Sequence, residues 1–383
     1  MNDLEKIADP NNLLEAFKQA SKGSIWKSSV QRYEANLLLN IYNTHKALLD
    51  GTYKQGPFLE FELNERGHNR RIKALGIADR VVQRSLCDNA LMPKLNKYFI
   101  HDNGASQKGK GVEFCRRRLE NHLHRYYRKY GNEGYCLHID FRKFFDNIRH
   151  DRVLAMLDKY LIDKSIMPLV RQMVNSFKID ISYSDHDLTD EVFNSLEYAK
   201  ISPQLKTGRT FMYKSLGIGS QVSQVIGVFF PTTIDNYCKI VKGCKFYGRY
   251  MDDVYIIHHD KQVLRTILKG VGEQARELGL FINPNKTQIS KLAHGFSFLK
   301  IRYNLTSKGR LIRRPYPRNI TRQRQKMKSF RHLLQSNRLS FADIENETKS
   351  WLGALSNLDA WHTAESIRHL FSELFGRRIV YHR

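Results

Sequence analysis

Two adjacent carboxylates, Asp252 and Asp253, lie between two apolar runs that are rich in aromatic and β-branched residues. Such runs predict two antiparallel strands joined by a tight turn, with the acidic pair at the turn. Neighbouring Asp side chains repel each other, so a fold that keeps them at a hairpin tip usually supplies cations. Hard divalent ions such as Mg²⁺ take oxygen ligands and hold phosphates. The pair therefore indicates phosphate chemistry at a divalent metal.

The Tyr250–Asp253 turn resembles the catalytic hairpin of reverse transcriptases, and a second segment fits the same family. Asp140 ends a predicted strand and is followed by an aromatic residue, Phe145, five positions on. The resemblance implies that Asp140 and Asp252 bind two Mg²⁺ ions, with Mn²⁺ as a substitute, and that Asp253 supports the site at its edge. One ion would activate the primer 3′-hydroxyl and the other would neutralise the triphosphate. Phe145 would exclude a ribose 2′-hydroxyl, which implies dNTP substrates.

A basic segment, Arg70, Arg71 and Lys73, surrounds a short predicted strand before a helix that starts near Asp79. It resembles the first fingers motif of bacterial reverse transcriptases, where basic side chains grip the incoming triphosphate. Guanidinium groups suit that role because they bind phosphate bidentately. A solvated strand face is the alternative interpretation of each single Arg.

A glycine-rich segment before an apolar helix contains Ile218, Gly219 and Gln224. Glycines there let the backbone lie against a nucleotide or template base. The segment resembles a palm motif in its Ile-Gly-x-x-x-Ser-Gln form, which implies a reverse transcriptase of a diversity-generating retroelement, with a structured template RNA and an accessory nucleic-acid-binding protein. Ser220 departs from the Asn expected after Ile-Gly. The alternative is an antiphage-defence, domesticated or prophage enzyme that works with a non-coding RNA.

Three further segments complete the resemblance. Lys286 follows a predicted strand and turn, as does the palm lysine that approaches the triphosphate. The segment 296–303 resembles the primer-gripping strand pair. Lys108 and Lys110 lie in a Gly-rich loop just ahead of the first carboxylate motif, and they are expected to contact template or nucleotide; a flexible, merely polar loop is the alternative.

A long basic segment follows the hairpin. Between Leu278 and Ala342 there is no Asp or Glu, while 15 Lys and Arg occur. The backbone of an RNA–DNA duplex would supply the missing counter-charge. The expected contacts are Arg313, Arg314, Arg318, Arg322, Arg324, Lys326 and Lys328.

The composition agrees with a nucleic-acid partner, because the net charge is +25. Charge that serves solubility alone is the alternative. The 5 cysteines are odd in number and widely spaced, so neither a disulfide framework nor a zinc ribbon is expected. The N-terminus does not have the pattern of a signal peptide, and 18 apolar residues never run together. We therefore expect a cytoplasmic protein without a membrane span, and the resemblance implies that it is bacterial or phage-encoded.

The resemblance implies an α+β right-hand polymerase fold with an antiparallel-sheet palm and a helical thumb. The expected parts are an N-terminal helical extension (1–49), fingers (50–134), a first palm part (135–178), an insertion of unknown role (179–213), a second palm part (214–305) and the thumb (306–383). A non-catalytic RNA-binding scaffold is the alternative from another class, and the three carboxylates argue against it. His258 and His259 lack further ligands at suitable spacing and are expected to be a polar strand end.

Overall fold

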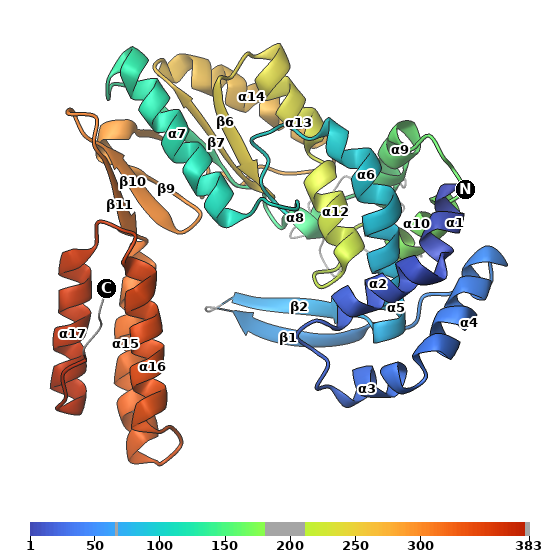
Figure 1. The fold of residues 1–383 in the computed structure, drawn as a ribbon. Helices are drawn as coiled ribbons and strands as arrows, with labels where there is room; N and C mark the ends of the chain where they lie inside the picture. The colour runs from blue at the N-terminus through green and yellow to red at the C-terminus, as the bar shows by residue number, and fades with distance from the viewer. Residues whose placement is uncertain (66–67, 181–210, 380–383) are drawn as a thin grey trace.

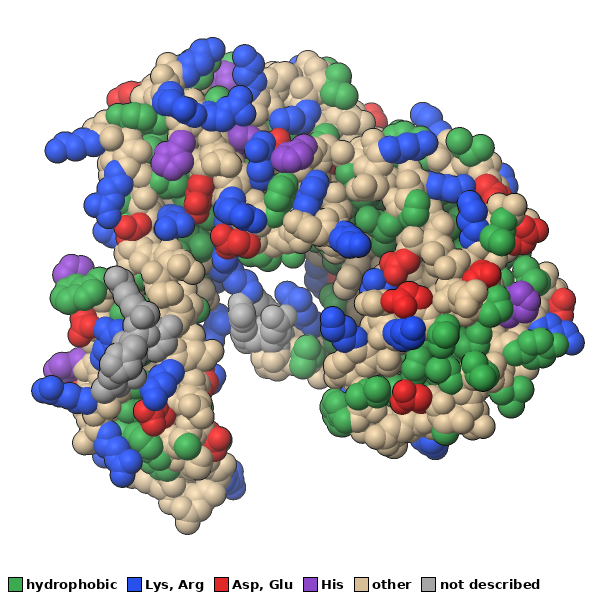
Figure 2. All heavy atoms as spheres, viewed as in Figure 1, with side chains coloured by type: hydrophobic (Ala, Val, Ile, Leu, Met, Phe, Trp, Pro, Cys, Tyr) green, Lys and Arg blue, Asp and Glu red, His purple; other side chains and the backbone are tan. Residues whose placement is uncertain are grey.

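The computed structural model describes residues 1–65, 68–180 and 211–379. Most of the expected insertion lies outside the described residues; its ends, Ile179–Asp180 (β4) and Phe211–Met212 (β5), pair with each other. Helices and antiparallel sheets alternate along the chain, which confirms the α+β prediction (Figure 1). Figure 2 shows an open cleft between two lobes, with Lys and Arg side chains along its edges.

The central sheet has four antiparallel strands in the order β6-β7-β3-β8. They are β6 (Phe246–Tyr250), β7 (Asp253–His258), β3 (Tyr135–Ile139) and β8 (Gln288–Lys291). Both faces are apolar because both are covered. One face joins a core that includes α14 (Lys261–Glu277), and the other packs under α7 (Val112–Tyr130).

The lobe on the right of Figure 1 consists of N-terminal helices and a β-hairpin. The expected helical N-terminus forms α1 (Asp3–Ala8), α2 (Pro10–Ser21), α3 (Ser28–Ala35) and α4 (Leu37–Leu49). The hairpin pairs β1 (Leu59–Glu65) with β2 (His68–Ala74). Alternation from Tyr53 predicts an earlier strand, but Gly56 and Pro57 interrupt it.

Short helices connect this lobe to the central sheet. They are α5 (Ile77–Leu86), a π-helical turn (Cys87–Leu91), α6 (Met92–Leu95), α8 (Phe144–Asn147), α9 (His150–Tyr160), α10 (Met167–Asn175), α12 (Gln221–Phe229) and α13 (Thr232–Asn236). Residues 150–175 thus form two helices, and Pro168 lies in the first turn of the second one.

A second sheet leads into the C-terminal helices. Its strands are β9 (Phe296–Phe298), β10 (Ile301–Leu305) and β11 (Leu311–Pro315), in the order β11-β10-β9. A turn with Gly309 at φ 77° sends the chain back as β11, so the helical part begins at Pro317 and not at residue 306. Its helices are α15 (Pro317–Gln335), α16 (Phe341–Leu355) and α17 (Trp361–Phe375), which share a core of their own.

Within the described ranges, no helix combines the length and the apolar character that crossing a membrane requires.

Candidate active site

Asp140 follows the last residue of β3, at one end of the central sheet. The chain after α14 folds over this end, and the Asn283 amide donates to the Asp140 carbonyl at 2.8 Å. Two side chains of that segment hold the carboxylate: Asn283 Nδ2 lies 3.0 Å from Oδ1, and Lys286 Nζ lies 3.3 Å from Oδ2. Asp140 is buried and oriented by the protein itself. Lys286 therefore lies beside Asp140 at this end of the sheet.

The β6–β7 hairpin brings the acidic pair to the same end of the sheet. Tyr250 pairs with Asp253, so Met251 and Asp252 form the turn between the strands. Met251 has φ 55°, in the left-handed region that residues with a side chain rarely adopt. The turn is therefore a conformation that its surroundings must hold.

The register of β3 and β7 decides which carboxylates meet. Ile139 lies opposite Val254, and the next position outward on each strand is Asp140 and Asp253. Asp252 lies in the adjoining turn. The structure therefore brings all three predicted carboxylates to one sheet end.

Electrostatic coupling among these groups is strong. Burial and then the charges of Asp253 and Asp140 raise the pKa of Asp252 to about 7, and Lys286 opposes the shift. His138 Nε2 lies 3.3 Å from Asp253 Oδ1. Although burial disfavours its charge, the hydrogen bond and charge of Asp253 raise the pKa of His138. The site thus carries more negative charge than its own cations neutralise.

This donor set fits a magnesium site that a substrate completes. Within the described residues, no three His, Cys, Asp or Glu side chains form a ready-made metal site. Mg²⁺ typically takes one or two carboxylates and fills the remaining positions with phosphate oxygens and water. Asp140 and Asp252 could supply those carboxylates, while Asp253 is engaged by His138.

A backbone contact links the β1–β2 hairpin to the glycine-rich segment before α12. The Lys73 amide donates to the Ile218 carbonyl at 3.0 Å, and Ile72 and Ile218 form an isolated bridge. Gly219 has φ 114°, and an added Cβ would lie 3.2 Å from Ile72 Cγ2. The glycine is needed at this crossing both for its backbone conformation and for the space.

Comparison with known families decides the assignment. A sequence model of the family described as reverse transcriptase (RNA-dependent DNA polymerase) matches residues 64–333. The chain belongs to the reverse transcriptase family. Its α+β architecture is accordingly the right-hand polymerase fold, with fingers, palm and thumb.

Solved structures give more distant similarities. A Candida albicans telomerase, solved in complex with a TWJ fragment of telomeric RNA, is 9% identical with a TM-score of 0.43, covering 84% of this chain and 62% of that one. An apo Candida tropicalis telomerase truncated from its C-terminal domain is 11% identical with a TM-score of 0.47, covering 68% and 56%. The chain thus spans less than two thirds of each telomerase chain. No curated protein sequence matches the chain.

The three basic fingers residues of this reverse transcriptase lie on different faces of the hairpin. Arg71 and Lys73 lie on the face of Glu60, with Nη2 at 2.5 Å and Nζ at 3.6 Å from its carboxylate. Arg70 is opposite Leu63 and lies on the other face. The structure therefore does not bring the three side chains together as one cluster.

Phe145 packs against the palm helix α12. Its ring lies where a Cβ on Gly227 would approach within 2.8 Å, and its carbonyl accepts from the Leu216 amide at 2.9 Å. The ring is half-buried, so the glycine fixes its position while leaving part of it exposed. Gln224 is exposed on the same helix, whose N-cap is Ser220.

The two loop lysines have different environments. Lys110 Nζ donates to the carbonyls of His101 and Asn103, each at 3.0 Å, and lies over the Phe114 ring. Lys108 is exposed. The structure gives Lys110 an internal bonding role that the sequence does not suggest.

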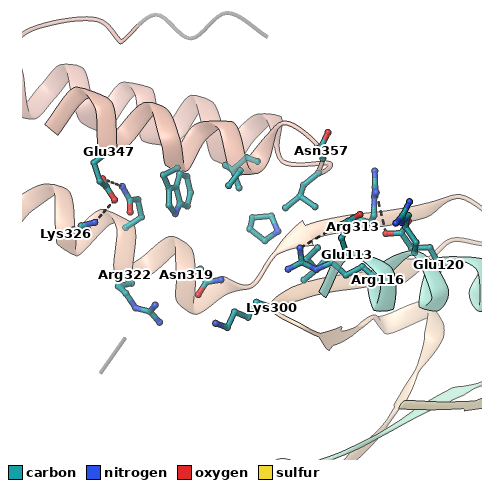
Figure 3. A pocket seen from close by; sticks show the side chains of 18 residues that line it. Glu113, Arg116, Glu120, Lys300, Arg313, Asn319, Arg322, Lys326, Glu347 and Asn357 are labelled. Carbon is teal, nitrogen blue, oxygen red and sulfur yellow. Dashed lines mark hydrogen bonds and ion pairs between the residues drawn. The ribbon is translucent and has the colours of Figure 1, made fainter. Parts of the chain in front are cut away.

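A groove of about 900 Å³ lies between α7, the β9–β10 turn and the thumb (Figure 3). Its basic residues are Arg116, Arg117, Lys300, Arg313, Arg322 and Lys326. Three glutamates also line it, and each lies near one cation: Glu113 at 3.8 Å from Arg116, Glu120 at 3.4 Å from Arg313, and Glu347 at 2.5 Å from Lys326. The remaining cations give the groove a positive balance.

The other predicted thumb contacts lie elsewhere. Arg324 Nη2 bonds Ser366 on α17 at 2.8 Å. Arg314, Arg318 and Lys328 are exposed. The predicted duplex-binding residues are thus distributed around β11 and α15 and do not form one face.

Sequence reasoning missed two groups that hold the carboxylates, His138 and Asn283. Asn283 precedes Pro284, a turn signature that places an amide next to the strand end. His138 alternates with Asp140 on β3, so both side chains belong to one face. Both signals are readable in the sequence once the strand is assigned.

Proposed function

We propose that this chain is an RNA-directed DNA polymerase that makes cDNA by nucleotidyl transfer to a primer 3′-hydroxyl. The observation that carries the proposal is the meeting of Asp140 with Asp252 at one sheet end, where burial, and then the charges of Asp253 and Asp140, raise the pKa of Asp252 to about 7. Such an acidic, half-buried site is suited to hold cations and phosphates.

The roles of the residues follow from their positions. Asp140 and Asp252 would hold two divalent ions, Mg²⁺ or Mn²⁺, which supply charge stabilisation to the attacking and leaving oxygens. Lys286 lies 3.3 Å from Asp140 Oδ2 with an exposed stem, so its ammonium group can turn to a triphosphate. Arg70, Arg71 and Lys73 would approach the same triphosphate from the fingers. Phe145 would close the space for a 2′-hydroxyl, which selects dNTPs.

A primer-extension assay tests the proposal with the Asp252→Ala variant. Synthesis on an RNA template with Mg²⁺ should fall by at least a thousandfold, because a metal ligand is lost, while template affinity stays within about threefold. Asp158→Ala, at an exposed carboxylate on α9, is the matched control and should extend primers normally. Retained synthesis by Asp252→Ala would sink the assignment of the site.

The basic groove and the thumb are proposed to hold the template RNA and the RNA–DNA duplex. Support comes from the cations of α7, β11 and α15 around Trp351 and other apolar residues, a combination that suits sugar-phosphate backbone and base or sugar stacking. Arg313, Arg322 and Lys326 line this groove, and Lys108, Arg314, Arg318, Arg324 and Lys328 would add contacts outside it.

We also propose that the biological role is error-prone copying in a diversity-generating retroelement of a bacterium or phage. The Ile218-Gly219 pair supports it, since the Ile218 side chain is 36% exposed beside the strand that carries Lys73. Such an enzyme would act in the cytoplasm with an accessory nucleic-acid-binding protein and a structured RNA.

The Ile218→Gln variant tests this role by sequencing of the cDNA. We expect the wild type to make frequent errors at template adenines and the variant to make at least threefold fewer. Absence of adenine errors in both proteins would contradict the mutagenic role and favour the antiphage-defence or domesticated enzyme. A template–variable repeat pair near the gene supports the first role, and a defence island supports the second.

A further inference from the structure

A completely buried arginine lies on the first strand of the β6–β7 hairpin, two residues before Met251. Arg249, on β6, is 0% exposed. Its Nη1 donates to the Met251 carbonyl at 3.0 Å, within the hairpin turn, and its Nη2 donates to the Val228 carbonyl of α12 at 2.9 Å. One side chain therefore ties the turn to a palm helix.

The guanidinium is itself fixed by a buried carboxylate. Asp235, on α13, accepts from Nε at 2.8 Å and from Nη2 at 2.6 Å, and it also accepts from the Tyr247 hydroxyl at 2.6 Å. Arg249, Asp235 and Tyr247 are each 0% exposed. Because Nε and Nη2 of the planar guanidinium bond the two Asp235 oxygens, its orientation is fixed, and Nη1 is directed at the turn.

The backbone of Arg249 is locked as well. Its amide donates to the Asp102 carbonyl at 3.0 Å, and its carbonyl accepts from the Gly104 amide at 3.2 Å. β6 is an edge strand of the central sheet, so these bonds secure a strand that has a partner on one side only. Both the position and the orientation of the guanidinium are therefore set before the turn begins.

The network's contribution is geometric. A buried ion pair is often no more stabilising than apolar residues of the same volume, because desolvation offsets the attraction. Asp235 also neutralises Arg249, which leaves little net charge to act on the catalytic carboxylates. Apolar residues could replace the ion pair, but they could not supply the hydrogen bond that Arg249 donates to the Met251 carbonyl.

We propose that Arg249, set by Asp235 and Tyr247, is a positioning residue that holds the Met251–Asp252 turn in its left-handed conformation. Met251 at φ 55° is unfavourable, and Asp252 is pushed away by neighbouring carboxylates. An anchored carbonyl opposes both effects and keeps Asp252 directed at Asp140. Without the anchor, the turn should relax and the carboxylates should bind divalent ions more weakly. The consequence for turnover rests on the proposed polymerase function, whereas the consequence for the turn does not.

The test replaces the whole network with apolar residues, in the triple variant Arg249→Met, Asp235→Leu and Tyr247→Phe. No buried charge is then left unpaired, so the fold should be kept. The first readout is amide hydrogen exchange of the hairpin without metal, and we expect exchange at Met251 and Asp252 to be at least tenfold faster. The second is Mn²⁺ affinity of the nucleic-acid-free protein, measured by the electron paramagnetic resonance of free Mn²⁺, which should fall at least tenfold.

A second variant, Arg249→Lys, keeps a positive charge beside Asp235 but removes the planar guanidinium. It tests the proposal if the triple variant does not fold. A single ammonium group cannot serve Asp235, Val228 and Met251 in the same geometry, so its Mn²⁺ affinity should also fall. Lys94→Met is the control, because it breaks the ion pair of another buried carboxylate, Asp3, away from the hairpin. It should lower the melting temperature and leave Mn²⁺ affinity unchanged.

Hairpin exchange and Mn²⁺ affinity within twofold of the wild type in a folded Arg249 variant would overturn the proposal. In primer extension, kcat should fall about a hundredfold while KM for the template–primer stays constant. A wild type that extends no primer, with Mn²⁺ affinity still lost in the variants, would contradict the polymerase function and support the positioning role.

Discussion

At the scale of single residues, the Phe145 ring is fixed in position by its backbone and by the helix it packs against. Its backbone is bonded to Leu216, and its ring rests on α12 where Gly227 leaves no side chain. If Phe145 closes the space for a 2′-hydroxyl as proposed, a ring held in this way would discriminate sterically, because moving it aside would disturb the helix behind it.

Truncating the Phe145 side chain should allow ribonucleotides to be incorporated. For Phe145→Ala, we expect the preference for dNTP over rNTP, expressed as the ratio of kcat/KM values, to fall at least tenfold. Single-nucleotide incorporation with dATP and ATP measures it. Phe145→Met keeps most of the bulk and should keep most of the preference, and an unchanged ratio in Phe145→Ala would contradict the role.

The positions of Asp140, Asp252 and Asp253 at a strand end and a hairpin turn could be predicted from the sequence, because strand alternation and turn signals are local. Arg249 could not, since its burial depends on Asp235, which comes from a helix earlier in the chain. Lys110 is a similar case: a lysine in a Gly-rich loop suggests phosphate contact, but here nearby carbonyls bind it. Strand alternation could have predicted that Arg70 lies on the opposite face of β2 from Arg71 and Lys73.

At the scale of elements, the decisive contact is the crossing of β2 with the segment around Gly219. An added Cβ would lie 3.2 Å from both Ile72 Cγ2 and the Lys73 carbonyl oxygen, at φ 114°. The crossing therefore couples the fingers strand that carries Lys73 to the start of α12, the helix under Phe145.

Gly219→Ala should loosen this crossing. We expect a loss of about 1–3 kcal/mol in unfolding free energy, from strain and contact together, and a rise of at least fivefold in KM for dNTP. Urea denaturation and steady-state extension measure the two effects. Gly243→Ala is the control, since φ there is 62° but the added Cβ would meet nothing within 4 Å; equal behaviour of the two variants would show that the crossing is unimportant.

The order of the elements was largely predictable, whereas some boundaries were not. The helices before residue 50, the Gly-rich loop before α7 and the hairpin with its turn at Asp252 follow the predicted pattern. β11 falls within the range expected for the helical thumb, 306–383. It is a strand because it pairs with β10, a non-local contact that local composition does not report.

At the scale of the whole molecule, Lys and Arg side chains lie along the edges of the cleft (Figure 2) and line the groove beside the thumb. The acid-free segment 278–342 is neutralised in part by acids from other segments, such as Glu120, Glu347 and Asp359. Arg117 and Arg322 have no acidic partner among the described residues and line the groove. They are the cations most available to phosphates.

Duplex affinity should therefore depend steeply on salt. Each phosphate contact that is removed should reduce the slope of log K against log [salt] by about one. We expect this change for Arg117→Ala and for Arg322→Ala, measured by fluorescence anisotropy with an RNA–DNA hybrid between about 50 and 300 mM KCl. Arg265→Ala, an exposed arginine on α14, should leave the slope unchanged; a groove variant with an unchanged slope would place the duplex elsewhere.

The link between Ile218 and Lys73 is made by a main-chain carbonyl, which every amino acid carries. The contact at this crossing thus requires glycine at position 219. It does not require any particular side chain at position 218. A single codon can change there without cost to folding, so natural drift and directed evolution can both explore it. Libraries that randomise residue 218 should yield mostly folded proteins, whereas libraries at residue 219 should not.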